Sequence, residues 1–293
     1  MKLLGTGLSG LVGSRVVELL SPSFTFQNYS LETGTDITNK EDIIAKITSN
    51  HEAPWVVHMA AFTDVQGAEK ERGLGEASAA WKVNVMATQN IADACRASGK
   101  RLLYVDTDYA FDGAKKDGYT EDDVPSPRGW YAVTKSEGAK RVLALENGLV
   151  IRISNPYRAR PIGKKDFAHK MLELLQSGQT ISAPQDQLFV PTFIDDIARA
   201  LERLVTTNAS GIYHVVSAPP ISPFDAAKAI AHTWGCDTNL VKPTTFAEYF
   251  TGRAPVPRYA VLANKKVTSL GIPMHDFVAG IEEVRRQESV IGK

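Results

Sequence analysis

The stretch "MKLLGTGLSGLVG" at residues 1–13 decides the fold, because it places Gly5, Gly7, Gly10 and Gly13 directly after an apolar run. The run Met1–Leu4 predicts a buried strand, and "LVGSRVVELL" at 11–20 predicts an amphipathic helix. In such a strand–helix turn, glycines allow a tight bend and let backbone N–H groups approach a pyrophosphate at the helix N-terminus. A plain tight turn is the alternative interpretation.

The four glycines can be framed in two ways, as Gly5-x-Gly7-x-x-Gly10 or as Gly7-x-x-Gly10-x-x-Gly13. The dinucleotide fingerprint also expects an acidic residue about 20 positions further on, against the adenosine ribose. Glu32 and Asp36 both stand near that distance. The choice between NAD and NADP therefore stays open.

Strand-like and helix-like segments alternate through the first half of the chain. The expected strands are Phe24–Tyr29, Trp55–Ala61, 101–107 and Leu149–Ser154, and the expected helices are Lys40–Thr48 (capped by Thr38 or Asn39), Ala79–Ala97 and Tyr131–Leu145. Strands that alternate with helices of ten or more residues indicate right-handed βαβ crossovers and a parallel sheet. The predicted fold class is α/β, with a Rossmann-like doubly wound parallel sheet.

After Ser154 the pattern changes to helices at 167–178 and 193–205, a strand at 211–217 and a proline-rich remainder. We expect an NAD(P)-binding domain at 1–158, to which 188–217 returns, and a smaller C-terminal substrate-binding lobe at 159–293. A ligand is expected in the cleft between this lobe and the carboxyl ends of the strands.

Composition excludes several classes of protein. Lys+Arg and Asp+Glu both total 33, so the basic excess of a nucleic-acid binder is missing. No apolar run reaches the roughly 20 residues that a membrane span needs, and no secretory leader is recognisable. Cys95 and Cys236 stand far apart, which argues against a disulfide framework or a metal site. We expect a cytoplasmic protein without metal, nucleic-acid or membrane partners.

Tyr131 and Lys135 stand four residues apart, on one face of the expected helix. A nearby ammonium favours the phenolate and lowers the phenol pKa, as proton transfer at neutral pH requires. Thr107, at the end of the fourth expected strand, could polarise a substrate carbonyl. This set suits carbonyl reduction, with hydride from a nicotinamide and a proton from the tyrosine.

Together these residues resemble the extended short-chain dehydrogenase/reductase superfamily. Its TGxxGxxG loop is matched by Thr6, Gly7, Gly10 and Gly13, which favours the second frame and assigns Gly5 to the strand end. By this resemblance Thr107, Tyr131 and Lys135 form the catalytic triad, and the cofactor is NADPH or NADH.

The chain is more closely similar to the dTDP-4-dehydrorhamnose reductase family, from Lys2 to about Tyr213. The matching stretches are "HMAAFTDVQGAE" (58–69), "DTDYAFDG" (106–113), "GYTEDDVPSPRGWYAVTKSEGAK" (118–140) and "PQDQLFVPTFIDDIARAL" (184–201). Tyr109 stands where sugar-nucleotide dehydratases of the superfamily carry an acidic residue, which favours simple reduction. The resemblance implies a nucleotide-sugar substrate, a monomer or homodimer, and Asn84 near the active site.

The resemblance also implies two sets of binding residues. The cofactor contacts, besides Tyr131 and Lys135, would be Gly7, Leu8, Ser9, Gly10, Leu11, Gly13, Asp36, Ile37, Ala60, Ala61 and Thr63. The substrate contacts would be Thr63, Val65, Asp108, Tyr109, Pro191, Thr192 and Arg253.

Three places depart from the family pattern. Arg253 and Arg258 are out of register with the C-terminal arginines that hold the diphosphate, Asp106 replaces the usual serine, and "SNPY" (154–157) replaces an aromatic-rich stretch. Two alternatives therefore stay open. One is a non-catalytic NAD(P)-binding regulatory subunit, like the β subunit of methionine adenosyltransferase, and the other is a sugar-nucleotide epimerase.

Overall fold

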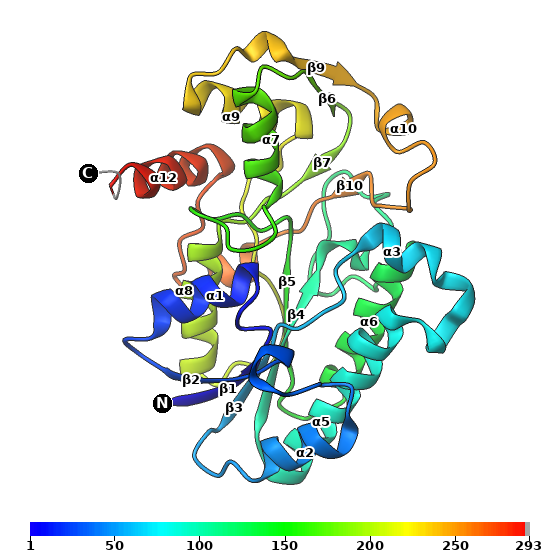
Figure 1. Ribbon diagram of the computed structural model, residues 1–293, viewed down its shortest axis with the longest axis vertical. Helices are drawn as coiled ribbons and strands as arrows, with labels where there is room; N and C mark the ends of the chain where they lie inside the picture. The colour runs from blue at the N-terminus through cyan, green and yellow to red at the C-terminus, as the bar shows by residue number, and fades with distance from the viewer. Residues whose placement is uncertain (291–293) are drawn as a thin grey trace.

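A six-stranded, fully parallel sheet forms the centre of the computed structural model, which describes residues 1–290 (Figure 1). Its strand order is β2-β1-β3-β4-β5-β8. The strands are β1 (Lys2–Thr6), β2 (Thr25–Tyr29), β3 (Trp55–His58), β4 (Arg101–Thr107), β5 (Leu149–Ile153) and β8 (Gly211–His214). The order reverses between β1 and β3, where doubly wound sheets bind ligands. The predicted fold class is confirmed.

Helices cover both faces of this sheet, because successive strand residues point to opposite sides. Leu3 packs in the core beneath α1 (Leu11–Leu20) and α8 (Ile194–Thr206). Leu4, its neighbour, packs in the core beneath α2 (Lys40–Thr48), α5 (Ala87–Ser98) and α6 (Trp130–Leu143). The carboxyl ends of β1, β3 and β4 are thereby held at one rigid edge.

Three expected elements differ most from the structure, and the others shift by at most two residues at an end. The strand expected at 211–217 ends at His214. The third strand ends at His58 rather than Ala61: the Met59 N–H still donates to the Thr6 carbonyl, and the chain then passes close to Gly7. The expected helix 79–97 is divided into α4 (Ala79–Trp81), a π-helical turn (Lys82–Met86) and α5. Such turns are rare and often accompany functional sites.

The C-terminal part of the chain packs around a second core rich in aromatic side chains, among them Tyr157, Phe167, Phe193 and Phe277. Its helices are α7 (Phe167–Gln176), α9 (Pro223–Trp234) and α12 (Phe277–Ser289). Its strand pairs are β6 (Ile181–Pro184) with β9 (Val241–Thr244), and β7 (Leu188–Phe189) with β10 (Tyr259–Ala260). Figure 1 shows this part standing above the carboxyl edge of the central sheet.

The remaining elements are short. They are α3 (Val65–Lys70), α10 (Phe246–Tyr249), α11 (Lys265–Thr268) and 3₁₀ turns at Leu31–Thr33, Arg72–Ala77, Asp108–Ala110 and Thr238–Leu240. In the part of the chain that the structure describes, no helix has both the length and the apolar character of a membrane span.

Candidate active site

A cavity of about 760 Å³ lies at the carboxyl edge of the central sheet. Most of the residues singled out in the sequence line it together: Gly7, Ser9, Gly10, Leu11, Gly13, Ala60, Ala61, Thr63, Val65, Thr107, Asp108, Tyr109, Tyr131 and Lys135. Residues more than 120 positions apart thus meet in one space. The glycine loop and the Tyr–Lys pair belong to the same site.

The glycine loop has the second of the two frames. Gly7 has φ +70°, and a Cβ there would lie less than 3.0 Å from the Ala60 backbone nitrogen. A Cβ at Gly13 would come as close to the Gly7 carbonyl oxygen. Gly10 is the N-cap of α1, with extended backbone, and Gly5 lies within β1. Glycine at positions 7 and 13 therefore permits the tight turn that leads into α1.

A buried polar chain supports this loop from below. Thr6 Oγ1 lies 2.6 Å from His58 Nδ1, and His58 Nε2 lies 2.9 Å from Thr88 Oγ1. Complete burial, with a smaller contribution from Lys135, lowers the pKa of His58 to about 3. His58 is therefore neutral and serves as a connector between β1, β3 and α5.

Asn84, in the π-helical turn, connects the wall of the cavity to α6. Its Oδ1 accepts from the Phe62 N–H at 2.8 Å, and its Nδ2 donates to the Phe62 carbonyl at 3.2 Å and to Thr134 Oγ1 at 3.0 Å. Thr134 lies on α6 between Tyr131 and Lys135. Asn84 itself is outside the cavity lining, so it acts on the site through its neighbours.

The electrostatics of the Tyr–Lys pair differ from the expectation. Burial lowers the pKa of Lys135 to about 8, and its Nζ donates to the Val105 carbonyl at 2.7 Å. The pKa of Tyr131 is raised, not lowered, first by burial and then by the charges of Asp106 and Asp108. The phenol has lost its water and faces two carboxylates, and both effects disfavour the phenolate. Tyr131 is a firmly protonated phenol, as a proton donor must be.

The Thr107 hydroxyl is hydrogen-bonded to the side chain of the next residue, Asp108. The hydroxyl donates to Asp108 Oδ1 at 3.0 Å, and the Ser154 hydroxyl donates to Asp108 Oδ2 at 2.6 Å. Burial raises the pKa of Asp108 to about 6, although both hydroxyls oppose the shift. The rings of Tyr109 and Tyr131 meet edge to face with centroids 6.1 Å apart. Thr107, Asp108 and Tyr109 therefore form one connected wall.

Several expected contact residues do not line this cavity. Leu8 and Ile37 are buried in the cores, and the Asp36 carboxylate accepts from the Thr38 N–H and hydroxyl. Pro191 and Thr192 form a buried backbone junction beside Ser154. The remaining one, Arg253, lies over the Tyr249 ring at 4.3 Å.

Other lining residues were not singled out in the sequence. Lys164, Lys165 and Lys170 bring positive charge to the rim, and Asn155, with φ +38°, faces the same space. The Lys164–Lys165 pair after a Pro-Ile-Gly turn is the sequence signal that could have pointed to this positive charge. The positive φ of Asn155 could not be predicted from the sequence, because asparagine adopts both negative and positive φ.

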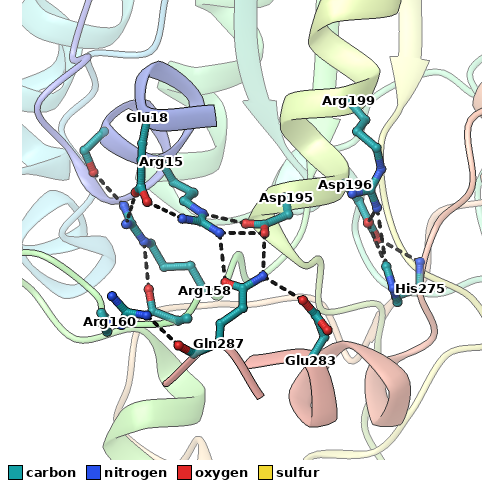
Figure 2. A network of polar contacts seen from close by, with 12 residues as sticks. Arg15, Glu18, Arg158, Arg160, Asp195, Asp196, Arg199, His275, Glu283 and Gln287 are labelled. Atoms are coloured by element: carbon teal, nitrogen blue, oxygen red, sulfur yellow. Dashed lines mark hydrogen bonds and ion pairs between the residues drawn. The ribbon is translucent and has the colours of Figure 1, made fainter. Parts of the chain in front are cut away.

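A network of charged side chains fixes the helix that follows the glycine loop (Figure 2). Arg15 on α1 makes two 2.7 Å contacts with the Asp195 carboxylate of α8, and it donates to Gln287 of α12 at 2.8 Å. Arg158, which follows β5, donates to Glu18 at 2.9 Å. The start of α1 is thereby tied to both parts of the chain.

Residues 1–289 match the RmlD substrate binding domain family. The chain is 32% identical to a dTDP-4-keto-6-deoxy-D-glucose reductase of Streptomyces niveus, covering 91% of this chain and 90% of that protein. It is 30% identical to a dTDP-4-dehydrorhamnose reductase of Aggregatibacter actinomycetemcomitans, covering 97% and 98%.

Solved structures agree with this relationship. A dTDP-4-dehydrorhamnose reductase of Bacillus anthracis in complex with NADP superposes with a TM-score of 0.88 at 29% identity, covering 98% of this chain and 99% of that one. A dTDP-glucose 4,6-dehydratase of Streptomyces venezuelae, at 19% identity, shares the fold alone with a TM-score of 0.80. The chain therefore belongs to the RmlD substrate binding domain family and is a reductase of the extended short-chain dehydrogenase/reductase type.

Proposed function

We propose that this chain is an NAD(P)H-dependent reductase of a 4-keto sugar carried on a nucleotide. The observation that carries the proposal is the meeting of Thr107, Tyr131 and Lys135 with the glycine loop in one cavity. A proton donor beside a phosphate-binding loop is what hydride transfer to a carbonyl needs.

The glycine loop fits a dinucleotide. A side chain at Gly7 or Gly13 would collide with backbone, so glycine is needed there for the tight turn that sets the α1 N-terminus at the cavity. When bound there, the nicotinamide would supply the hydride. The tip of β2 carries Asn28, whose Oδ1 accepts from the Leu8 N–H, and no carboxylate. A neutral tip tolerates a 2′-phosphate, so we propose that NADPH is accepted as well as NADH.

Tyr131 would donate its proton to the carbonyl oxygen of the substrate as the hydride arrives. Its raised pKa keeps the proton in place until charge develops on that oxygen. Lys135, whose pKa of about 8 leaves it mostly an ammonium at neutral pH, would stabilise the phenolate that remains. Thr107, held by Asp108, would orient the carbonyl.

The substrate class is proposed from two supports. The curated relatives named above are reductases of dTDP-linked keto sugars. The lining residues Lys164 and Lys170 offer positive charge to a diphosphate, whereas Lys165 is paired with Glu173 at 2.8 Å. The segment that bears them belongs to the proposed substrate-binding lobe at 159–293. The sugar and the nucleotide base are left open by this proposal.

The test is oxidation of NADPH and NADH by the purified chain over a panel of nucleotide-linked 4-keto sugars. Net consumption of cofactor would exclude an epimerase, and activity of the chain alone would exclude a purely regulatory subunit. The variant Tyr131→Phe should lower kcat by about 10²–10⁴-fold with NADPH binding nearly unchanged. Undiminished turnover in that variant would refute the role of Tyr131.

A further inference from the structure

A buried charged ladder crosses three neighbouring strands behind the cavity. Asp106 on β4 is the register partner of Arg152 on β5, and Arg152 is the partner of His214 on β8. Arg152 Nε donates to Asp106 Oδ2 at 3.2 Å, and Arg152 Nη1 lies 3.3 Å from His214 Nε2. All three residues are at most 2% exposed. A buried ion pair of this kind is costly and calls for an explanation.

The ladder holds Asp106 in one position. Burial, reinforced by the charge of Arg152, lowers the pKa of His214 to about 3, so His214 is neutral. His214 Nδ1 lies 3.2 Å from the Ala263 carbonyl and donates to it, which leaves Nε2 free to accept from Arg152. The guanidinium also lies over the Phe111 ring at 4.9 Å. Arg152 is therefore fixed on three sides, and it fixes the Asp106 carboxylate.

The second carboxylate oxygen of Asp106, Oδ1, makes no hydrogen bond with Arg152. Within residues 1–290, Asp106 Oδ1 is buried and has no hydrogen-bond partner. Asp106 lies in the cavity lining directly between Val105, whose carbonyl accepts from Lys135, and Thr107. Arg152 pairs with the Asp106 carboxylate through Oδ2 alone, and a partly compensated charge in a buried site still acts over several ångströms on its neighbours.

We propose that Asp106 is a positioning residue of this reductase: its carboxylate, fixed by Arg152, keeps Lys135 an ammonium and Tyr131 a phenol across the working pH range. The proposal rests on the reductase function proposed above and adds a residue to it. Asp106 stands where the resembled family more usually carries serine.

The charges that face the pair come from several elements. Asp106 opposes the effect of burial on Lys135 and raises the pKa of Tyr131. Asp108, on the turn after β4, acts on Tyr131 in the same direction. His58, on β3, is neutral at all relevant pH values. Asp106 is therefore the one carboxylate among these groups that acts on both Lys135 and Tyr131.

The test uses Asp106→Asn, which keeps an acceptor for Arg152 but removes the charge, and Asp106→Ser as a second variant should the first fail to fold. The alkaline limb of the kcat/KM profile for NADPH-dependent reduction should move down by about one pH unit. At pH 8 this corresponds to a several-fold loss of kcat/KM, with little change at pH 6. The KM for NADPH should change less than kcat.

A second readout needs no turnover. The Lys135 amine in protein containing isotopically labelled lysine, assigned with Lys135→Met, can be titrated by NMR in the free chain. Its midpoint should fall in both Asp106 variants. In the control Asp196→Asn, which removes an equally buried carboxylate paired with Arg199 and His275 outside the cavity, neither the midpoint nor the profile should move.

An unchanged Lys135 midpoint in a folded Asp106 variant would overturn the proposal. So would a shift of the same size in the Asp196→Asn control, because it would mark a general loss of stability. Should the wild-type chain reduce no keto sugar, the proposed function fails, while the Lys135 titration still decides the role of Asp106.

Discussion

Replacing Asn84 with alanine tests whether the π-helical turn holds the active site together. The substitution removes three hydrogen bonds: two with the Phe62 backbone and one with Thr134. At a net value of about 1 kcal/mol each, the free energy of unfolding should fall by about 3 kcal/mol. The buried position of Asn84, which is 1% exposed, leaves little water to replace the lost partners.

The same change should disturb catalysis more than cofactor binding. Thr134 lies within one helical turn of both Tyr131 and Lys135, so a shift of α6 misplaces the proton donor. We expect kcat to fall by about tenfold or more, since small misplacements of reacting groups are expensive. NADPH affinity should change little, because the chain from Thr6 through His58 and Thr88 reaches only the backbone carbonyl of residue 84, which the substitution keeps.

Urea denaturation followed by tryptophan fluorescence gives the stability, and steady-state kinetics give kcat. Asn90→Ala is the matched control, because Asn90 lies on the adjoining α5 and no hydrogen bond of its side chain is seen among the described residues. That control should lose less than about 1 kcal/mol. A loss below 1 kcal/mol in Asn84→Ala, or equal losses in both variants, would refute the reasoning.

Two further predictions concern the glycine loop and the contact between α7 and α12. Gly13→Ala should weaken NADPH binding, measured by fluorescence titration, by at least about tenfold, because its Cβ would meet the Gly7 carbonyl. In Gly10→Ala the nearest atom is 3.3 Å away, so the loss should be much smaller; equal losses would contradict this. Burial lowers the pKa of His169, but hydrogen bonds with the carboxylates of Asp166 and Glu288 outweigh burial and raise the pKa to about 9. Its stabilising charge is present below pH 6.5 and is lost as the pH rises through 9. The thermal midpoint of the wild type should fall over that window, and that of His169→Gln should not.

The order of elements was predictable because it depends on local patterns. Short apolar runs with intervening amphipathic stretches specify strands buried on both faces and the helices that cover them. The bounds were less predictable where a tertiary contact decides them. The Asn84 turn is an example: its extra residue is stabilised by Phe62, Thr134 and the close approach of Gly138, none of which is near in sequence.

The candidate site was predictable where a motif fixes the backbone. The glycine loop and the Tyr–Lys pair each carry their geometry in their spacing, so they meet at the sheet edge as expected. Arg253 was named by resemblance alone, and Asp36 by resemblance and by its distance from the glycine loop; both lie outside the cavity lining. Both side chains contact neighbours in the sequence instead: the Asp36 carboxylate accepts from the Thr38 hydroxyl, and the Arg253 guanidinium stacks on the Tyr249 ring.

The anchoring of α1 could not be derived from any local pattern. Arg15 and Asp195 are 180 positions apart, and on their own helices each is an ordinary polar residue. Their side chains are nevertheless only 11% and 8% exposed, because α12 closes over them through Gln287 (Figure 2). The helix that presents the phosphate-binding loop is thus fixed by the last helix of the chain. A movement of α12 would therefore act on α1, and on the glycine loop before it, through this buried, charge-paired contact.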